Sequence, residues 1–213
     1  MFEKLPESVG HVLVDQRAGM EQVVYNHLHA QRDVPRLSVS SPTFAFNGRL
    51  PVRYTADGEG ISPPIAWSDC PSDTASVAII VEDADSPTPH PLVHAIAIDV
   101  TSEDRAIPEG ALSAPNATPS DLEIGANSFF RHSWLPPDPP PGHGEHRYVF
   151  QVFALRQGPP FSKTAGRKEF IDRILDRAIA VGCLIGTYER GSIQKSGDEA
   201  LVEQQPESIV IPA

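Results

Sequence analysis

The stretch "RYVFQVFALR" (147–156) is apolar at most of its positions, without a strict alternation of apolar and polar side chains. A strand with one face in water alternates, whereas a strand covered on both faces does not. The segments "SVAIIVED" (76–83) and "LVHAIAIDV" (92–100) share this character. The three segments predict the central strands of a sheet that other layers cover on both faces.

The segment that leads into 147–156 reads "PPDPPPGHGEH" (136–146). Proline fixes its own backbone and excludes regular helix, so this approach is rigid. One interpretation is an exposed polyproline ligand for an adaptor domain. The direct continuation into a buried strand favours another interpretation, in which the prolines form the wall of a pocket.

Polar side chains gather at the ends of the predicted central strands. Two aspartates follow the strand 76–83, one histidine lies near the start of the next strand, and another opens the third. Strand alternation puts His146 and Tyr148 on one side and Arg147 on the other. If the strands are neighbours, these groups meet at one rim. The candidate site residues are Asp83, Asp85, His94, His146, Arg147 and Tyr148.

The residue types at this rim suit a small anion. Imidazole N–H and tyrosine hydroxyl groups donate hydrogen bonds to phosphate or carboxylate, and an aspartate can orient an imidazole ring from behind. A metal site is the competing interpretation, because His90 and His94, and likewise His143 and His146, have ligand-like spacings. Those spacings put two histidines on one face only in a helix, and these segments are loops or strands. We therefore predict no metal and no cofactor.

Two other classes of function remain open. An enzyme would use His94 or His146 as a general acid or base, with Asp85 orienting the ring. No nucleophile elbow, P-loop or dinucleotide motif accompanies them in the sequence. An interaction or inhibitor module would instead act through its surface and leave the pocket unused.

The two ends of the chain have helical patterns. In residues 1–36 apolar side chains recur at roughly helical spacing with a break near Gly19, which predicts an N-terminal helical arm. Because an apolar stripe has to be buried, the arm should pack on the main body or on a second subunit, and we favour packing across a two-fold homodimer. The segment "KEFIDRILDRAIAVG" (168–182) predicts a C-terminal helix ending at Gly182, and "CLIGTYER" (183–190) a last strand.

Weaker strand candidates are "TFAF" (43–46), "VRYT" (52–55) and "NSFF" (127–130). The predicted organisation is a helical arm (1–36), a mainly β domain (37–191) and a polar C-terminal tail (192–213).

Composition narrows the class of partner. The 213 residues carry a formal net charge of −11, which argues against a nucleic-acid partner and against adhesion to acidic lipid headgroups. The start "MFEKLPESVG" lacks the apolar run of a secretion signal, and the sequence shows no membrane span. Cys70 and Cys183 are too few for a disulfide framework. We expect a cytoplasmic protein without stable membrane insertion.

Several of these motifs together resemble the phosphatidylethanolamine-binding protein family. "DADSP" (83–87) is similar to the family pattern Asp-Pro-Asp-x-Pro, and "PPPGHGEHRYVFQVFAL" (139–155) to its Gly/Pro-rich run ending in His-Arg-Tyr. "SPTFAFNGRLPVRYTADGEGISPPIAW" (41–67) and the closing helix followed by "GTYER" (186–190) resemble the bacterial branch, often labelled Raf-kinase-inhibitor-like.

The resemblance implies a mainly β protein: a β-sandwich with peripheral helices and a small anion pocket at one edge. It carries the ligand-binding role to Asp83, Asp85, Pro87, His94, His146 and Tyr148, and a supporting role to Arg147. Asp138 departs from the family pattern, where animal members have glycine, and a carboxylate there would disfavour anions. We therefore expect a non-catalytic protein that binds phosphate, a phosphoester headgroup or a carboxylate.

Overall fold

The computed structural model describes residues 7–101, 105–113 and 122–190. Its main feature is a six-stranded sheet with the order β2-β9-β8-β4-β5-β7. The four central strands are long and antiparallel to their neighbours, while β2 pairs in parallel with β9 at one edge. The strands are β2 (Gly48–Arg49), β4 (Ser76–Asp83), β5 (Leu92–Thr101), β7 (Glu123–Ile124), β8 (His146–Leu155) and β9 (Ala178–Tyr188).

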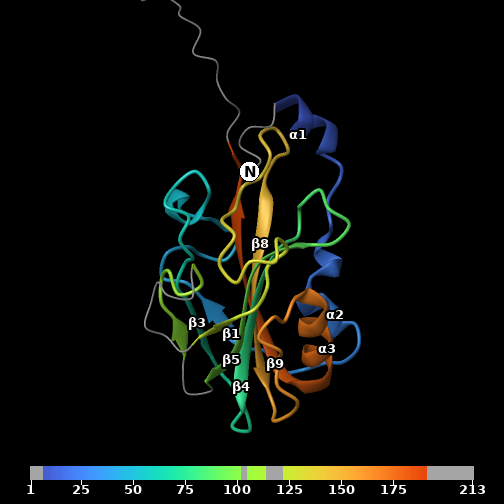
Figure 1. Cartoon of the computed structure of the whole chain (residues 1–213), viewed down its shortest axis with the longest axis vertical. Helices are drawn as coiled ribbons and strands as arrows, with labels where there is room; N and C mark the ends of the chain where they lie inside the picture. The colour runs from blue at the N-terminus through green and yellow to red at the C-terminus, as the bar shows by residue number, and fades with distance from the viewer. Residues whose placement is uncertain (1–6, 102–104, 114–121, 191–213) are drawn as a thin grey trace, which may run out of the picture.

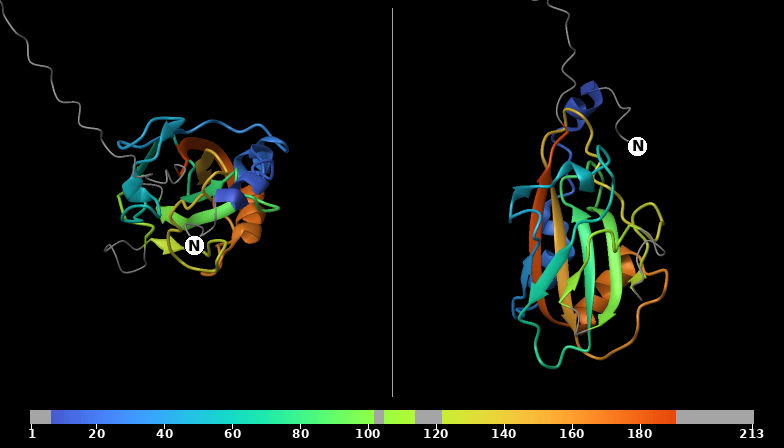
Figure 2. Two further views of the ribbon diagram at one scale, coloured as in Figure 1. Left: turned by 90° about the horizontal axis from the view of Figure 1, so that it is seen from above. Right: turned by 90° about the vertical axis from the view of Figure 1, so that its left-hand side faces the viewer.

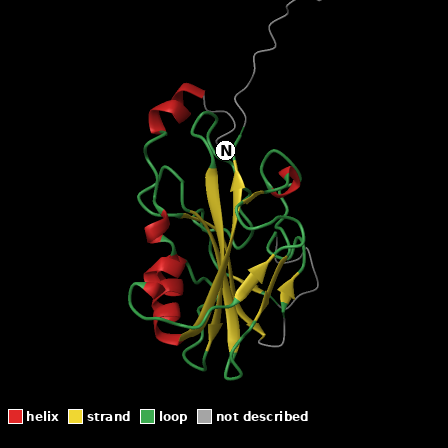
Figure 3. Cartoon of the chain, turned by 180° about the vertical axis from the view of Figure 1, so that it is seen from behind, coloured by secondary structure: helices red, strands yellow, loops and turns green. Residues whose placement is uncertain are grey.

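Two further layers cover the faces of this sheet (Figures 1 and 3). On one face lies a three-stranded sheet of β1 (Ser38–Ser40), β3 (Ile65–Ser68) and β6 (Ala106–Ile107). On the other lie α2 (Val24–His29) and α3 (Arg167–Arg177). Figure 2 shows the layers from above and from the side. The remaining helices are α1 (Glu7–Leu13) and two 3-10 turns, η2 (Met20–Gln22) and η3 (Val52–Tyr54).

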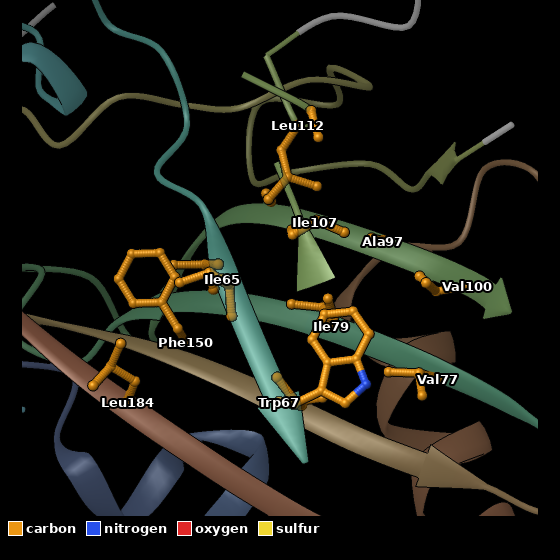
Figure 4. Packing of buried hydrophobic residues seen from close by; sticks show 14 of the residues in the cluster. Ile65, Trp67, Val77, Ile79, Ala97, Val100, Ile107, Leu112, Phe150 and Leu184 are labelled. Atoms are coloured by element: carbon orange, nitrogen blue, oxygen red, sulfur yellow. The ribbon is translucent and has the colours of Figure 1, made fainter. Parts of the chain in front are cut away.

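Successive side chains of the central strands point alternately into two hydrophobic cores, one on each face of the large sheet. Val77, Ile79 and Val81 of β4 face the small sheet, where they join Ile65 and Trp67 of β3 (Figure 4). Their neighbours in β4 face the helices, and the second core consists mainly of Val24, Leu28, Ala78, Ile80, Ile96, Phe153, Phe170 and Ile174. Every residue of β4 is buried. The prediction of central strands without polar alternation is therefore confirmed, together with a mainly β sandwich bearing peripheral helices.

The N-terminal segment packs against its own domain. Val24 and Leu28 of α2 are fully buried between the sheet and α3. The start of α2 is held by the buried carboxylate of Glu82, which accepts a hydrogen bond from the main-chain N–H of Val24 at 2.9 Å. The second half of the apolar stripe is therefore buried within one chain, whereas Val12 of α1 is 79% exposed. The homodimer remains a prediction.

The structure corrects four local predictions. The C-terminal helix ends at Arg177, not Gly182, because the segment from Ala178 onward pairs with β8 and its β-branched side chains fill the core. The segment 43–46 lies outside the strands, 52–55 contains the turn η3, and 127–130 is a tight turn. Phe44 and Tyr54 of these segments are buried from loops and turns, whereas Phe46 and Phe130 are exposed. No helix of the described ranges is long and apolar enough to cross a membrane.

Candidate functional site

Strand register brings the predicted site residues to one end of the large sheet. Asp83, the last residue of β4, lies opposite both Tyr148 near the start of β8 and Leu92 at the start of β5. Because β4 is antiparallel to both neighbours, its exit coincides with their entries. Three segments far apart in the sequence therefore meet at one rim.

A cavity of about 250 Å3 opens at this rim. The predicted residues Asp83, Pro87, His94 and His146 line it, whereas Asp85 and Tyr148 do not. The proline-rich approach forms part of the wall, as the pocket-wall interpretation predicted. The other lining residues are Ala56, Ser86, Thr88, Leu92, Phe129, Arg131, Leu135, Pro136, Asp138, Pro139 and Pro140.

The two ring nitrogens of His94 differ in their hydrogen bonding. Its Nδ1 lies 2.5 Å from the carbonyl oxygen of Leu135, which can only accept, so Nδ1 carries the proton. Nε2 is buried and has no hydrogen-bond partner in the described part of the chain. Burial lowers the pKa of His94, with Asp83 and the Leu135 carbonyl opposing it. The neutral ring therefore presents a lone pair from Nε2.

His146 has both ring nitrogens engaged. Nδ1 lies 2.8 Å from the Oδ2 atom of Asp83, and Nε2 lies 2.6 Å from Nδ1 of His143. The other oxygen of Asp83 accepts the main-chain N–H of Asp85 at 2.8 Å. His146 thus contributes its ring to the cavity wall, while both of its nitrogens are hydrogen-bonded to other protein groups.

Asp85 lies behind the cavity and joins two arginines. Its carboxylate accepts two side-chain hydrogen bonds from Arg147, at 2.7 Å each, and lies 3.0 Å from the guanidinium of Arg17. Burial alone would raise the pKa of Asp85, but the hydrogen bonds from Arg147 and Arg17 lower it to about 2. Arg147 ties down this loop, and Asp85 orients neither imidazole.

Tyr148 is a wall residue beneath the site. Its side chain is fully buried, and its hydroxyl has no hydrogen-bond partner among the described residues. The ring contacts His94 edge-on, with 5.1 Å between centroids, and stacks with His146 at 6.4 Å. Burial raises the pKa of Tyr148 well above its ordinary value, with Asp83 and Asp138 adding to the effect. Its contribution is to position the two imidazoles.

The carboxylate of Asp138 belongs to an ion-pair cluster at the far wall. Arg190 lies 2.6 Å from Asp138 and also pairs with Asp57, which accepts the hydroxyl of Tyr188 at 2.7 Å. Burial would lower the pKa of Arg190, but the hydrogen bonds that it donates to Asp57 and Asp138 raise it. The penalty that the sequence predicted for an anion near Asp138 is thus offset only in part, because Asp57 and Asp138 share the single charge of Arg190.

Sequence reasoning missed three residues of the site. Arg131 lines the cavity mouth from the loop after β7. It follows the turn at 127–130, which was predicted from the sequence as a weak strand. Arg17 comes from the N-terminal arm, which offers no motif. His143 was considered as a metal ligand, but its Nδ1 bonds to His146. Within the described segments, no three His, Cys, Asp or Glu side chains are grouped to hold a metal.

Comparison with known proteins agrees with the geometry. The family model described as phosphatidylethanolamine-binding protein matches residues 40–189. The UPF0098 protein of Aquifex aeolicus is 35% identical over 155 residues, covering 72% of this chain and 89% of its own length. A UPF0098 protein of Methanothermobacter thermautotrophicus is 32% identical over 154 residues, covering 70% of this chain and 97% of its own length.

Solved structures have the same fold. CT736 of Chlamydia trachomatis, a proposed phosphatidylethanolamine-binding protein homolog, has a TM-score of 0.65 at 27% identity, covering 73% of this chain and 98% of its own. YbcL of Escherichia coli has a TM-score of 0.68 at 23% identity, covering 73% and 99%. With its sandwich, its strand-end motifs and the matched residues 40–189, the chain belongs to the phosphatidylethanolamine-binding protein family.

Proposed function

We propose that the cavity binds a small oxyanion, such as a phosphate, a phosphoester headgroup or a carboxylate, and that the protein does so without catalysis. The observation that carries this proposal is Nε2 of His94, a buried polar atom without a partner in the described residues, on a ring that lines the cavity. Buried polar atoms are almost always hydrogen-bonded, so a ligand or water is expected there.

Charge around the cavity favours an anion in spite of its carboxylates. Asp83 is paired with His146, and Asp138 with Arg190, which Asp138 shares with Asp57. Arg131 adds an exposed guanidinium at the cavity mouth. It can contact a bound anion there without being buried itself. An oxyanion at His94 needs one proton between its oxygen and Nε2, carried either by the ring or by the ligand.

The size and the walls fit a headgroup more than a large substrate. The cavity volume of about 250 Å3 lies below the roughly 300–1,000 Å3 typical of pockets for drug-sized ligands. Leu92, Leu135 and several prolines give it apolar walls. Relatives are named for phosphatidylethanolamine, whose headgroup combines a phosphodiester with a short chain. This headgroup is one member of the proposed ligand class.

Catalysis is less well supported by the contacts. The hydroxyl of Ser86 donates to the carbonyl of Asp83, and that of Thr88 to the carbonyl of His90. Neither hydroxyl is hydrogen-bonded to an imidazole in the described part of the chain, so neither has a base to activate it. His94 lacks a carboxylate behind Nδ1, since a carbonyl holds that position.

The proposal is tested by calorimetric titration with sulfate, phosphate, phosphoethanolamine and acetate. The variant His94→Asn keeps a donor near the position of Nδ1 and removes Nε2. His132→Asn is the matched control, because His132 also bonds a carbonyl through Nδ1, at 2.8 Å from Ile124, and lies outside the cavity. We expect His94→Asn to weaken binding at least about tenfold, worth about 1.4 kcal/mol, and the control to bind normally.

Equal affinity of His94→Asn and the wild type would overturn the proposal. So would the absence of binding of all four anions to the wild type. A co-purified molecule that the protein converts during incubation would favour an enzyme instead.

A further inference from the structure

An N-terminal strap, residues 10–19, joins the two motif loops of the site. The main-chain N–H of Ala18 donates to the carbonyl of Ser86 at 3.0 Å, and that of Gly19 to Ala84 at 2.8 Å. From the same strap, Arg17 donates to the carbonyl of Glu145 at 2.9 Å. One short segment therefore holds the loop after β4 against the loop before β8.

The strap lies outside the part of the chain that the family model matches, which begins at residue 40. Its first turn is nonetheless fitted closely to the site. A Cβ atom on Gly10 would lie 1.9 Å from the carbonyl oxygen of Pro141, so only glycine allows α1 to approach this loop. Figure 1 shows α1 at the same end of the molecule as the start of β8.

The strap is also connected to the cavity wall through a series of hydrogen bonds, which begins at a main-chain carbonyl of the strap. The carbonyl of Leu13 lies 2.7 Å from Nε2 of His143, whose Nδ1 lies 2.6 Å from Nε2 of His146. Nδ1 of His146 then lies 2.8 Å from the carboxylate of Asp83. A chain of three hydrogen bonds thus runs from the strap to the cavity wall.

Proton counting shows that this array of hydrogen bonds holds one proton more than two neutral imidazoles supply, so one ring is positive and balances the carboxylate of Asp83. Each of the three hydrogen bonds needs one proton, and two neutral imidazoles supply only two. With Asp83 as a carboxylate, a third proton makes one of the two rings an imidazolium. The extra proton is shared by the coupled groups of the array, but the contacts of each ring indicate which ring carries it.

The contacts favour His146 as the charged ring, because its Nδ1 lies 2.8 Å from the carboxylate of Asp83, whereas Nε2 of His143 lies against two main-chain carbonyls. The carbonyl of Leu13 requires a proton on Nε2 of His143, so a neutral His143 has a bare Nδ1 that can accept. Burial lowers the pKa of His143, and the neighbouring His146 and Arg17 add to this. His146 therefore donates from both nitrogens, to His143 and to Asp83. The groups that face the two rings are Arg17, Asp83, His94, Asp138 and Tyr148, together with the Arg147–Asp85 pair behind them.

We propose that the strap is a working part of the ligand site: it anchors His143 as a proton acceptor, and His143 in turn holds His146 as a cation in the cavity wall. The proposal deepens the anion-binding function and rests on it. His143 is a positioning residue, since it acts through His146. Loss of the strap removes the Leu13 carbonyl that holds the proton of His143 on Nε2, so His143 is no longer fixed as an acceptor and the cavity then loses positive charge.

Two substitutions at one position separate the strap from the acceptor. The amide of His143→Asn lies near the place of Nδ1, so its oxygen can accept from His146, but it does not reach Leu13. The amide of His143→Gln lies near the place of Nε2, so it can donate to Leu13, but it leaves His146 without an acceptor. The rest of the site is unchanged in both variants.

The first measurement is the protonation of the His146 ring nitrogens by nitrogen-15 NMR in the ligand-free protein at pH 7. We expect two protonated nitrogens in the wild type and in His143→Asn, and one in His143→Gln. A wild-type His146 with one bare nitrogen, or a His143→Gln protein that keeps both protons, would overturn the proposal. This readout does not depend on any ligand.

The second measurement is sulfate affinity at pH 7. We expect His143→Gln to bind about tenfold more weakly, a change of about 1.4 kcal/mol. Arg17→Ala, which loosens the strap, should also weaken binding, whereas Arg156→Ala, an exposed arginine at the opposite end of β8, should not. If His146 loses a proton in the His143→Gln variant but the variant binds sulfate normally, the strap has no role in binding. If the wild type shows two protons but binds no anion, the proposed function fails while the effect on His146 stands.

Discussion

Nδ1 of His94 lies 2.5 Å from the main-chain carbonyl oxygen of Leu135, so this histidine is held with its proton away from the cavity. A donor-rich cradle for anions was expected at this rim, and one of its donors is instead an acceptor. Binding of an oxyanion must therefore bring a proton to Nε2. This linkage makes affinity depend on pH in a defined direction.

Sulfate affinity should rise as pH falls. In the free protein burial lowers the pKa of His94, and an adjacent anion favours the protonated ring and raises that pKa. At a pH between the pKa of His94 in the free protein and that in the complex, binding takes up a proton. We expect this below about pH 6.5, the ordinary pKa of histidine. Calorimetry from about pH 5 to 7 measures the slope, since the charge of sulfate is constant there. A flat profile in the wild type, or the same slope in His94→Asn, would contradict this.

Replacing Glu82 by Gln should destabilise the domain. Glu82 is fully buried, lies 2.7 Å from Arg167, and accepts hydrogen bonds from the start of α2 and from Gln151. Removing the carboxylate charge leaves the guanidinium without its partner, and we expect a loss of about 2–3 kcal/mol because Arg167 is partly solvated. Urea unfolding measures it, with the exposed Glu123→Gln as control. A loss below about 0.5 kcal/mol would show that the cluster is dispensable.

Replacing Asp85 by Asn should cost stability at neutral pH and little in acid. The folded pKa of Asp85 is about 2, below its usual value of 3.8, so its contribution is present above 3.8 and is lost as pH falls toward 2. The shift corresponds to about 2 kcal/mol at pH 7. Chemical denaturation at pH 7 and near pH 2.5 compares the two proteins. A difference that is the same at both pH values would assign the effect to packing and not to charge.

Replacing Phe130 by Asn should stabilise the protein slightly. Phe130 is 88% exposed and has a positive φ of 58°, a conformation that is strained for a bulky side chain. Asn adopts it more readily, so we expect a gain of about 0.5–1 kcal/mol in thermal or urea unfolding. Phe46→Asn is the control, because Phe46 is also exposed but is not among the described residues with positive φ. A destabilised Phe130→Asn protein would mean that the ring packs on something in solution.

The central strands were predictable because their burial shows in the sequence. Segments 76–83 and 147–156 are apolar on both faces, and β4 and β8 match them within a residue at each end. The helix predicted to Gly182 failed because its periodicity continues by chance into β9. Pairing with β8 decides between helix and strand there, and this partner lies about thirty residues away in the sequence.

At the site, strand alternation and register placed Asp83, His94 and His146 together correctly. The sequence could not show that Nδ1 of His94 would meet a carbonyl, or that His143 would lie between the strap and His146. Both depend on loop backbones whose course is set by long-range contacts. Arg17 and Arg131 have no local pattern at all, so only the folded chain relates them to the cavity.

The end of β4 places two consecutive carboxylates in different layers. Glu82 points to the helices and holds the start of α2, while Asp83 points to the cavity and holds His146. A slip of β4 by one residue would exchange these environments, burying each carboxylate beside the wrong partners. Errors in strand pairing during folding are therefore penalised twice, on both faces of the sheet. The ligand site and the helical layer should for this reason be acquired in one cooperative step.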